Sequence, residues 1–158
     1  MSKLVGNRLG GVVYWEYIEL IRSKWEGPMI LKGILHPDDA TKAKQVGCDS
    51  VYVSNHGGRQ FDGAPSPLHP LMKIRNALGP NYPIIYDSGI RSGLDILKAI
   101  YAGADLVFSG RPFMYGVGAL GKQGGNHTIS LMKREFQQVM EQVCCERVED
   151  LPQHLLTK

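Results

Sequence analysis

One unit occurs four times along the chain and limits the folds that it can adopt. Each unit consists of a short apolar segment, a glycine-containing loop and a helical pattern. The apolar segments fall at residues 29–31, 50–54, 83–86 and 106–108. The helical patterns that follow them begin near residues 37, 68, 92 and 113. Short, continuously apolar strands that alternate with helices are typical of a parallel sheet with a helix-covered outer face.

The number of units indicates how much of such a fold is present. A closed barrel of this type needs eight strands and roughly 250 residues, and the sequence contains four units, so it predicts an α/β half-barrel. A helix over Trp15–Trp25 precedes the first unit, because apolar residues recur there at helical spacing. The whole chain, 1–158, is interpreted as one partial domain. Its parts are an unassigned leader (1–14), the βα units (15–120) and C-terminal helices (121–158), including a long helix over 128–144.

Composition excludes several classes of protein. The net charge is only +3, and the 18 Lys and Arg residues are scattered, which argues against a nucleic-acid partner. The three cysteines predict neither a disulfide framework nor a zinc site, and we interpret them as inert thiols in a reducing cytosol. No segment reaches the roughly 18 apolar residues of a membrane span. No secretory signal opens the chain, so we expect a soluble or at most peripheral protein.

The most informative motif follows the second strand. It contains His56-Gly57-Gly58-Arg59, so an imidazole and a guanidinium leave the C-terminal end of that strand together. Barrel enzymes carry their catalytic groups at this end of the strands. Imidazole titrates near neutrality and can accept a proton, and guanidinium can bind a carboxylate through two parallel hydrogen bonds. The motif therefore indicates a base and an anion-binding group three positions apart.

Two further loops indicate a phosphate site. Asp87-Ser88-Gly89-Ile90-Arg91 follows the third strand, and Ser109-Gly110-Arg111-Pro112 follows the fourth. Each combines glycine with an arginine near a helix start, where backbone N–H groups favour an anion. The alternative is that the glycines only form tight turns and the arginines are solvated.

Lys32 ends the first strand and is either a ligand-facing residue at the barrel mouth or an ordinary strand-end charge. The other histidines are assigned to the surface, and no pair of them has metal-ligand spacing, so no metal site is predicted. They are His36, His69, His127 and His154.

Together these motifs closely resemble those of the FMN-dependent 2-hydroxy acid dehydrogenases and oxidases. The resemblance runs from about Trp15 to Leu156 and is greatest to the bacterial quinone-linked L-lactate dehydrogenases. It implies that the chain is the C-terminal half of a TIM (β/α)8 barrel and that FMN is the cofactor. The motifs that carry the resemblance are Leu31-Lys32-Gly33-Ile34, residues 54–60 with Asp62-Gly63, residues 87–91 and Gly110-Arg111-Pro112.

The resemblance also implies a role for each motif. His56 is the catalytic base and contacts the substrate, and Arg59 binds the substrate carboxylate. Lys32 lies beside the flavin N1 and O2, where a cation stabilises negative charge on the reduced ring. The other flavin contacts fall to Ser54, Asp87, Ser88, Gly89, Ile90, Arg91, Gly110 and Arg111. The implied reaction oxidises a small L-2-hydroxy acid, with L-lactate as the first expectation, to the 2-oxo acid.

Members of this family carry four further strands, which supply an aspartate that orients the catalytic histidine. Without that partner, we expect the isolated chain to be weakly active or inactive, because loss of a triad carboxylate costs about 10⁴ in rate. The expected macromolecular partner is a missing N-terminal half-barrel or, by self-association through edge strands, a second copy. Two alternative functions are a non-catalytic half-barrel that binds FMN or another phosphate ester, and a different phosphate-binding barrel enzyme. The expected location is cytoplasmic, with the periphery of the inner membrane as an alternative.

Overall fold

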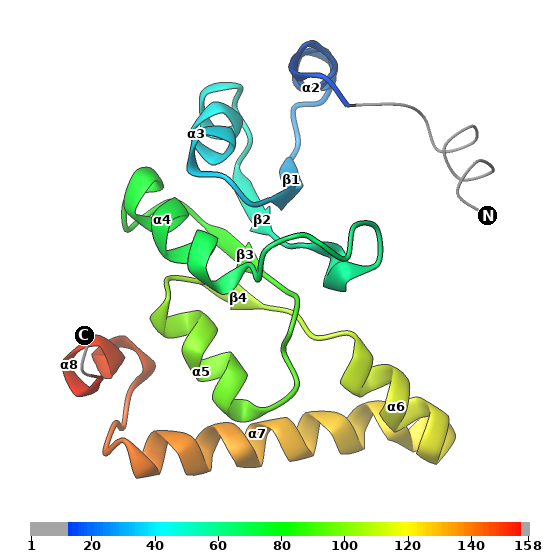
Figure 1. Cartoon of the computed structure of the whole chain (residues 1–158), viewed down its shortest axis with the longest axis vertical. Helices are drawn as coiled ribbons and strands as arrows, with labels where there is room; N and C mark the ends of the chain where they lie inside the picture. Colours follow the sequence, from blue (N-terminus) through cyan, green and yellow to red (C-terminus); the bar gives the residue numbers. More distant parts are fainter. Residues whose placement is uncertain (1–12, 156–158) are drawn as a thin grey trace.

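A parallel sheet of four strands forms the centre of the structure, a computed structural model that describes residues 13–155 (Figure 1). The strands are β1 (Ile30–Ile34), β2 (Ser50–Val53), β3 (Ile84–Tyr86) and β4 (Leu106–Val107), and they lie in the order β1-β2-β3-β4. All neighbouring pairs are parallel. The predicted α/β architecture of four successive βα units is therefore confirmed. The predicted leader, residues 1–14, lies outside the described residues except for its last two.

Helices connect the strands and extend the chain beyond them. Ser92 begins α5 with a capping box, in which its side chain and that of Asp95 each accept a backbone N–H. Among residues 13–155, no helix combines the length and the apolar character needed to cross a membrane. The helices are α2 (Trp15–Lys24), α3 (Pro37–Gln45), α4 (Leu68–Leu78), α5 (Gly93–Tyr101), α6 (Arg111–Leu120), α7 (Gly124–Gln142) and α8 (Leu151–His154), with short 3₁₀ turns η1 (His56–Gly58), η2 (Gly121–Gln123) and η3 (Val148–Asp150).

The two faces of the sheet differ in burial. Side chains alternate between faces along a strand, and one face packs against helices to form the core, where Val53 and Ile84 are fully buried. In Figure 1, α3, α4 and α5 lie along this side of the strands. On the other face, Leu106 is 52% exposed. The strand pairing aligns Leu106 in one row with Ile85, Tyr52 and Lys32.

This open row is what half of a barrel should present. In a complete barrel, the row would point into the interior, which is filled by layers of side chains from all the strands. Within residues 13–155, the apolar members of the row remain partly exposed, and the outer edges of β1 and β4 have no neighbouring strand. The sheet is therefore suited to be completed by further strands.

Helices α6 and α7 are in close contact at a glycine of each helix. Helix α7 lies beneath α5 and α6 (Figure 1) and packs on both. A Cβ atom on Gly124 would overlap the backbone of Gly116 and Val117. This close approach explains why α7 begins at Gly124, four residues before the predicted start at Thr128. At position 124, only glycine allows this contact.

We expect the substitution Gly124→Ala to lower the free energy of unfolding by about 2 kcal/mol, because an added methyl group would force α6 and α7 apart. Gly125→Ala is the matched control, since a Cβ at Gly125 meets no atom within 4 Å. Alanine also has a higher helix propensity than glycine, so the control variant should be as stable as the wild type or more stable. Urea denaturation measures both variants. Equal losses of stability would show that the glycine contact does not determine the packing.

Other predicted boundaries shift by one to three residues. Strand β1 continues past Lys32 to Ile34, because β2 supplies pairing partners on both sides of a register shift at Gly33. Helix α6 begins at Arg111 rather than near Phe113, since proline is tolerated in the first turn of a helix. Arg111 is therefore the first helical residue rather than part of a loop. The prediction of four surface histidines is confirmed, because all four are exposed.

Candidate active site

The carboxyl ends of the four strands lie at the same edge of the sheet, since all the strands are parallel. The segments that leave this edge are residues 35–36 after β1, 54–67 after β2, 87–92 after β3 and 108–110 after β4. Apart from Lys32, which lies within β1, every predicted site residue lies on one of these segments or at the start of α6. The fold therefore brings residues that are up to 79 positions apart, Lys32 and Arg111, to one edge.

Lys32 and Asp87 form the charged centre of this edge. The Lys32 Nζ lies 3.4 Å from an Asp87 carboxylate oxygen and donates a hydrogen bond of 3.0 Å to the Ser54 hydroxyl. The same ammonium lies 4.6 Å from the centre of the Tyr52 ring, within the range of a cation–π contact. Ser54 is fully buried, whereas the Lys32 side chain is 40% exposed. The lysine is therefore fixed by neighbours and still accessible from the open face.

The ionisation of Asp87 reflects this environment. Burial raises the pKa of Asp87, but hydrogen bonds from Ser54, Ser88 and Tyr52, together with the charge of Lys32, outweigh burial and lower the pKa below its usual value. Burial, with the nearby Asp87, raises the pKa of Tyr52. Asp87 is therefore a carboxylate at neutral pH, and Tyr52 keeps its hydroxyl proton.

A lowered pKa makes Asp87 a pH-dependent contributor to stability. Its contribution is fully present above the unfolded-state pKa, near 4, and is lost as the pH falls through the lower folded-state pKa. We therefore expect the difference in unfolding free energy between the wild type and Asp87→Asn to be larger at pH 7 than at pH 3. Urea titrations at the two pH values measure it, with Asp38→Asn, whose side chain is 91% exposed, as the control. An unchanged difference would contradict the assignment.

The turn that carries His56 has an unusual backbone. His56, Gly57 and Gly58 follow one another with φ angles of 55°, 66° and 73°, all in the left-handed region. Glycine adopts this region freely, but a residue with a side chain pays roughly 1–2 kcal/mol there. A strained residue of this kind persists only where its surroundings enforce it, and such residues cluster at functional sites.

Contacts from three strand ends hold this turn. The Gly57 N–H donates to the Asn55 side chain at 2.9 Å and to the Ser88 hydroxyl at 3.2 Å. The Gly57 carbonyl accepts a hydrogen bond of 2.7 Å from the Arg111 guanidinium. The imidazole of His56 lies over Gly33, where an added Cβ would come within 2.9 Å of its Cε1. His56 is consequently half-buried beside the strand that carries Lys32.

Arg59 follows the turn directly. Its backbone N–H donates to the His56 carbonyl at 3.3 Å, which closes the turn, and the residue is exposed. Its guanidinium is therefore accessible at the same edge as His56. The backbone of Arg59 is therefore bonded to that of His56, and the Arg59 side chain is exposed to solvent.

The two glycine loops differ in how they present their residues. Gly89 and Gly110 both have open space where a Cβ would lie. Ile90 is 5% exposed and belongs to the core, so only its backbone can face a ligand. The Arg91 N–H donates to Asp95 in the cap of α5, and its side chain is exposed. Gly110 is the N-cap of α6.

Three residues of this edge are missing from the set predicted from the sequence. Asn55 stabilises the turn, Tyr52 packs against Lys32, and Gly33 makes room for the imidazole. An asparagine before His-Gly-Gly is a signal for a side-chain-stabilised turn and could have been recognised. The positions of Tyr52 and Gly33 depend on strand register and side-chain packing, for which the sequence carries no local signal.

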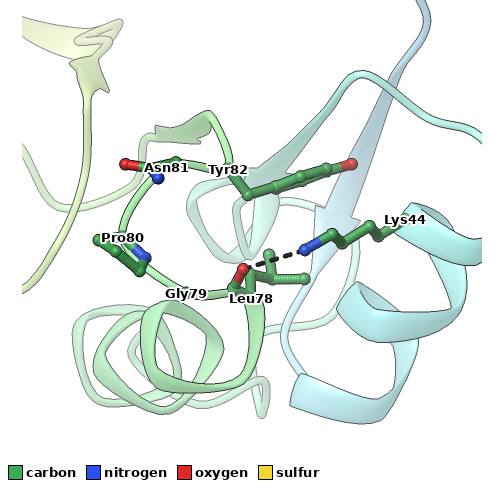
Figure 2. A pocket seen from close by; sticks show the side chains of 6 residues that line it. All are labelled: Lys44, Leu78, Gly79, Pro80, Asn81 and Tyr82. Atoms are coloured by element: carbon green, nitrogen blue, oxygen red, sulfur yellow. Dashed lines mark hydrogen bonds between the residues drawn. The ribbon is translucent and has the colours of Figure 1, made fainter.

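Two cavities lie at opposite edges of the sheet. One of about 180 Å³ adjoins the site and is lined partly by Ser66, Ser88 and Gly89. The other, about 380 Å³, lies in the loop before β3, at the amino ends of the strands (Figure 2). There Lys44 donates to the Leu78 carbonyl at 3.2 Å and lies over the Tyr82 ring. Its ammonium group is therefore used in packing, and this end of a barrel serves stability rather than catalysis.

Comparisons with known proteins agree with the geometry. The sequence matches the family described as FMN-dependent dehydrogenase over residues 1–158. It is 40% identical over 152 residues to the L-lactate dehydrogenase of Actinobacillus pleuropneumoniae, covering 96% of this chain and 40% of that protein. It is 44% identical over 126 residues to an FMN-dependent alpha-hydroxy acid dehydrogenase of Penicillium citrinum, covering 80% of this chain and 31% of that protein. The chain thus spans less than half the length of these relatives.

Solved structures show the same relation. A crystal structure of mandelate oxidase with benzoyl-formic acid superposes with a TM-score of 0.84 at 38% identity, covering 94% of this chain and 43% of that one. Mandelate oxidase with (S)-4-hydroxymandelic acid gives a TM-score of 0.83 at 38% identity, covering 90% and 40%. The four-stranded fold of the chain therefore matches part of the larger fold of mandelate oxidase.

Proposed function

The chain belongs to the FMN-dependent dehydrogenase family, and we propose that its strand ends form the flavin and substrate side of a barrel that oxidises an L-2-hydroxy acid to a 2-oxo acid. One observation carries this proposal above the others. Lys32 and the His56 backbone both donate to the Ser54 hydroxyl, and Arg111 donates to the carbonyl of Gly57 in the same turn. These residues are a cation for the flavin ring, a base for the substrate and an anion-binding group for the FMN phosphate.

The residues present fit FMN. Arg111 begins a helix of ten residues whose exposed N–H groups favour a phosphate, and Gly110 leaves the approach open. Arg91 and the backbone of residues 87–90 would complete the phosphate and ribityl contacts. Lys32, with Ser54, would lie against the ring, since its accessible ammonium suits a group that becomes negative. When bound, FMN would accept the two electrons that the substrate loses.

The chain's own residues then have separate tasks. Arg59 binds the carboxylate of the hydroxy acid and orients it, since a guanidinium matches the two oxygens of a carboxylate. An imidazole nitrogen of His56 receives one of the two protons that the substrate loses, and the other would leave with the two electrons that FMN accepts. Asp87 stays ionised and keeps Lys32 in place. The loop after β2, which carries both His56 and Arg59, holds these groups at a fixed separation.

We propose L-lactate as the substrate and a complementary half-barrel as the partner. Relatives named L-lactate dehydrogenase support the first part. The open row of the sheet and the unpaired edges of β1 and β4 support the second. The complementary half would supply strands for both edges and apolar side chains for the interior. We also propose a cytoplasmic location, since Cys48, Cys144 and Cys145 are free thiols. If the electrons pass to a quinone, the protein would lie at the inner membrane.

A chimera tests this function. In it, this chain replaces the matching segment of the Actinobacillus pleuropneumoniae L-lactate dehydrogenase, so that the barrel is complete. We expect the purified chimera to bind FMN and to produce a 2-oxo acid from L-lactate or L-mandelate but not from the D-isomers. A folded, FMN-loaded chimera that converts none of these acids would overturn the proposal.

Arg111→Ala tests the phosphate site. We expect it to weaken FMN binding to the chimera about 100-fold, because a charge-assisted contact to phosphate is lost. Riboflavin, which lacks the phosphate, should bind both proteins with similar affinity in equilibrium dialysis. The control is Lys122→Ala, an exposed cation beyond the end of α6. Equal FMN affinity of Arg111→Ala and the parent chimera would exclude a phosphate contact for Arg111.

A further inference from the structure

The Ser88 hydroxyl occupies an unusual position between the strand ends. It donates a hydrogen bond of 2.8 Å to an Asp87 carboxylate oxygen. It also accepts hydrogen bonds of 3.2 Å from the backbone N–H groups of Asn55 and of Gly57, the two residues that flank His56. Ser88 is therefore linked both to the carboxylate that pairs with Lys32 and to the turn that carries the proposed base.

These three bonds use the full capacity of the hydroxyl group, which has one proton to donate and two lone pairs. Any hydrogen bond from this side chain to a ligand would have to replace one of them. The backbone supports the same conclusion, because Ser88 has a φ of 82°, in the region that residues with side chains rarely adopt. Glycine would adopt this conformation without strain but could not form the three hydrogen bonds of the hydroxyl.

We propose that Ser88 is a positioning residue, whose hydroxyl fixes the turn carrying His56 to the Lys32–Asp87 pair. This inference rests on the proposed function for its catalytic consequence but not for its structural one. The turn is strained at His56, and two of the backbone groups around that residue are held by Ser88. Without the hydroxyl, the turn keeps the contacts of Asn55, Arg111 and the Ser54 hydroxyl, which accepts the His56 N–H at 3.0 Å, but it loses both hydrogen bonds to the loop after β3.

Two substitutions separate the hydroxyl from the backbone strain. Ser88→Ala removes the hydroxyl and keeps the strain, whereas Ser88→Gly removes both. If only the backbone conformation at position 88 matters, Ser88→Ala should destabilise the protein and Ser88→Gly should not. A positioning hydroxyl predicts that both variants loosen the His56 turn, while Ser88→Gly retains the global stability of the wild type. Ser66→Ala, a change to another serine of the same cavity, is the control.

The first readout is amide hydrogen exchange of the chain itself. We expect exchange at the Asn55 and Gly57 amides to become about tenfold faster in both Ser88 variants, since each loses one hydrogen bond. Core amides such as those of Val53 and Ile84 should be unaffected in Ser88→Gly. Unchanged exchange at both amides would overturn the proposal, whatever the activity of the protein.

The second readout is the kinetics of the chimera. We expect Ser88→Gly to lower kcat about tenfold while the KM for the hydroxy acid and the Kd for FMN stay within twofold, because only the base is misplaced. A raised Kd for FMN with kcat unchanged would show that the hydroxyl binds the cofactor and would overturn the proposal. If the parent chimera is inactive, the proposed function fails, and the exchange experiment still decides whether Ser88 holds the turn.

Discussion

Replacing His56 by alanine is expected to lower the rate constant of flavin reduction in the chimera about 10³-fold, the scale of general-base catalysis. The neighbouring groups cannot replace the imidazole. Lys32 is a cation paired with Asp87, and the lowered pKa of Asp87 makes this carboxylate a weak base. Stopped-flow absorbance of the flavin after anaerobic mixing with L-lactate measures the rate constant.

The backbone of His56 requires a second variant, because alanine at a φ of 55° is strained as histidine is. Asparagine tolerates the left-handed region, so His56→Asn preserves the turn without providing a base. Both variants should lose activity equally. His69→Ala, at an exposed position of α4, is the control for removal of a histidine. Substantial activity in both His56 variants would show that another group accepts the proton.

Replacing Arg59 by alanine is expected to lower kcat/KM for L-lactate by about 10²–10³-fold, since two charge-assisted hydrogen bonds to the carboxylate are lost. Most of the effect should appear in KM, because the carboxylate remains charged throughout the reaction and its contact is made in the ground state as well. Steady-state assays over a range of lactate concentrations separate the two constants.

Arg59→Lys refines this result. A lysine keeps the charge but cannot form the paired hydrogen bonds of a guanidinium, so we expect only partial recovery. Gln60→Ala, a change at the adjacent exposed residue, is the control for disturbance of the loop. If Arg59→Ala has the same KM as the parent chimera, the carboxylate is bound by a different residue.

The order of strands and helices could be predicted from the sequence because each strand is mainly apolar and is followed by a helical pattern. Residues at strand ends could be assigned to one edge for the same reason, since parallel strands all end there. This argument placed Lys32, His56 and Arg111 together. Whether these residues bind flavin and substrate stays a prediction, which the variants above test.

Contacts between loops could not be predicted in this way. The bonds from Ser88 to Asn55 and from Arg111 to Gly57 join residues 33 and 54 positions apart. Their existence depends on backbone angles such as the positive φ of Ser88, and serine gives no sign of that conformation in a sequence. The start of α7 escaped prediction for a related reason, since the glycine that begins it is required by a neighbouring helix.

The most direct test of the central claim is a crystal structure of the chimera with FMN and a 2-oxo acid product. The proposed arrangement predicts the Arg111 guanidinium at the FMN phosphate and the Lys32 ammonium at the flavin ring. It also predicts His56 and Arg59 in contact with the 2-oxo acid on one face of that ring. A structure in which FMN occupies another part of the barrel, or in which His56 and Arg59 lie apart from the bound acid, would contradict it.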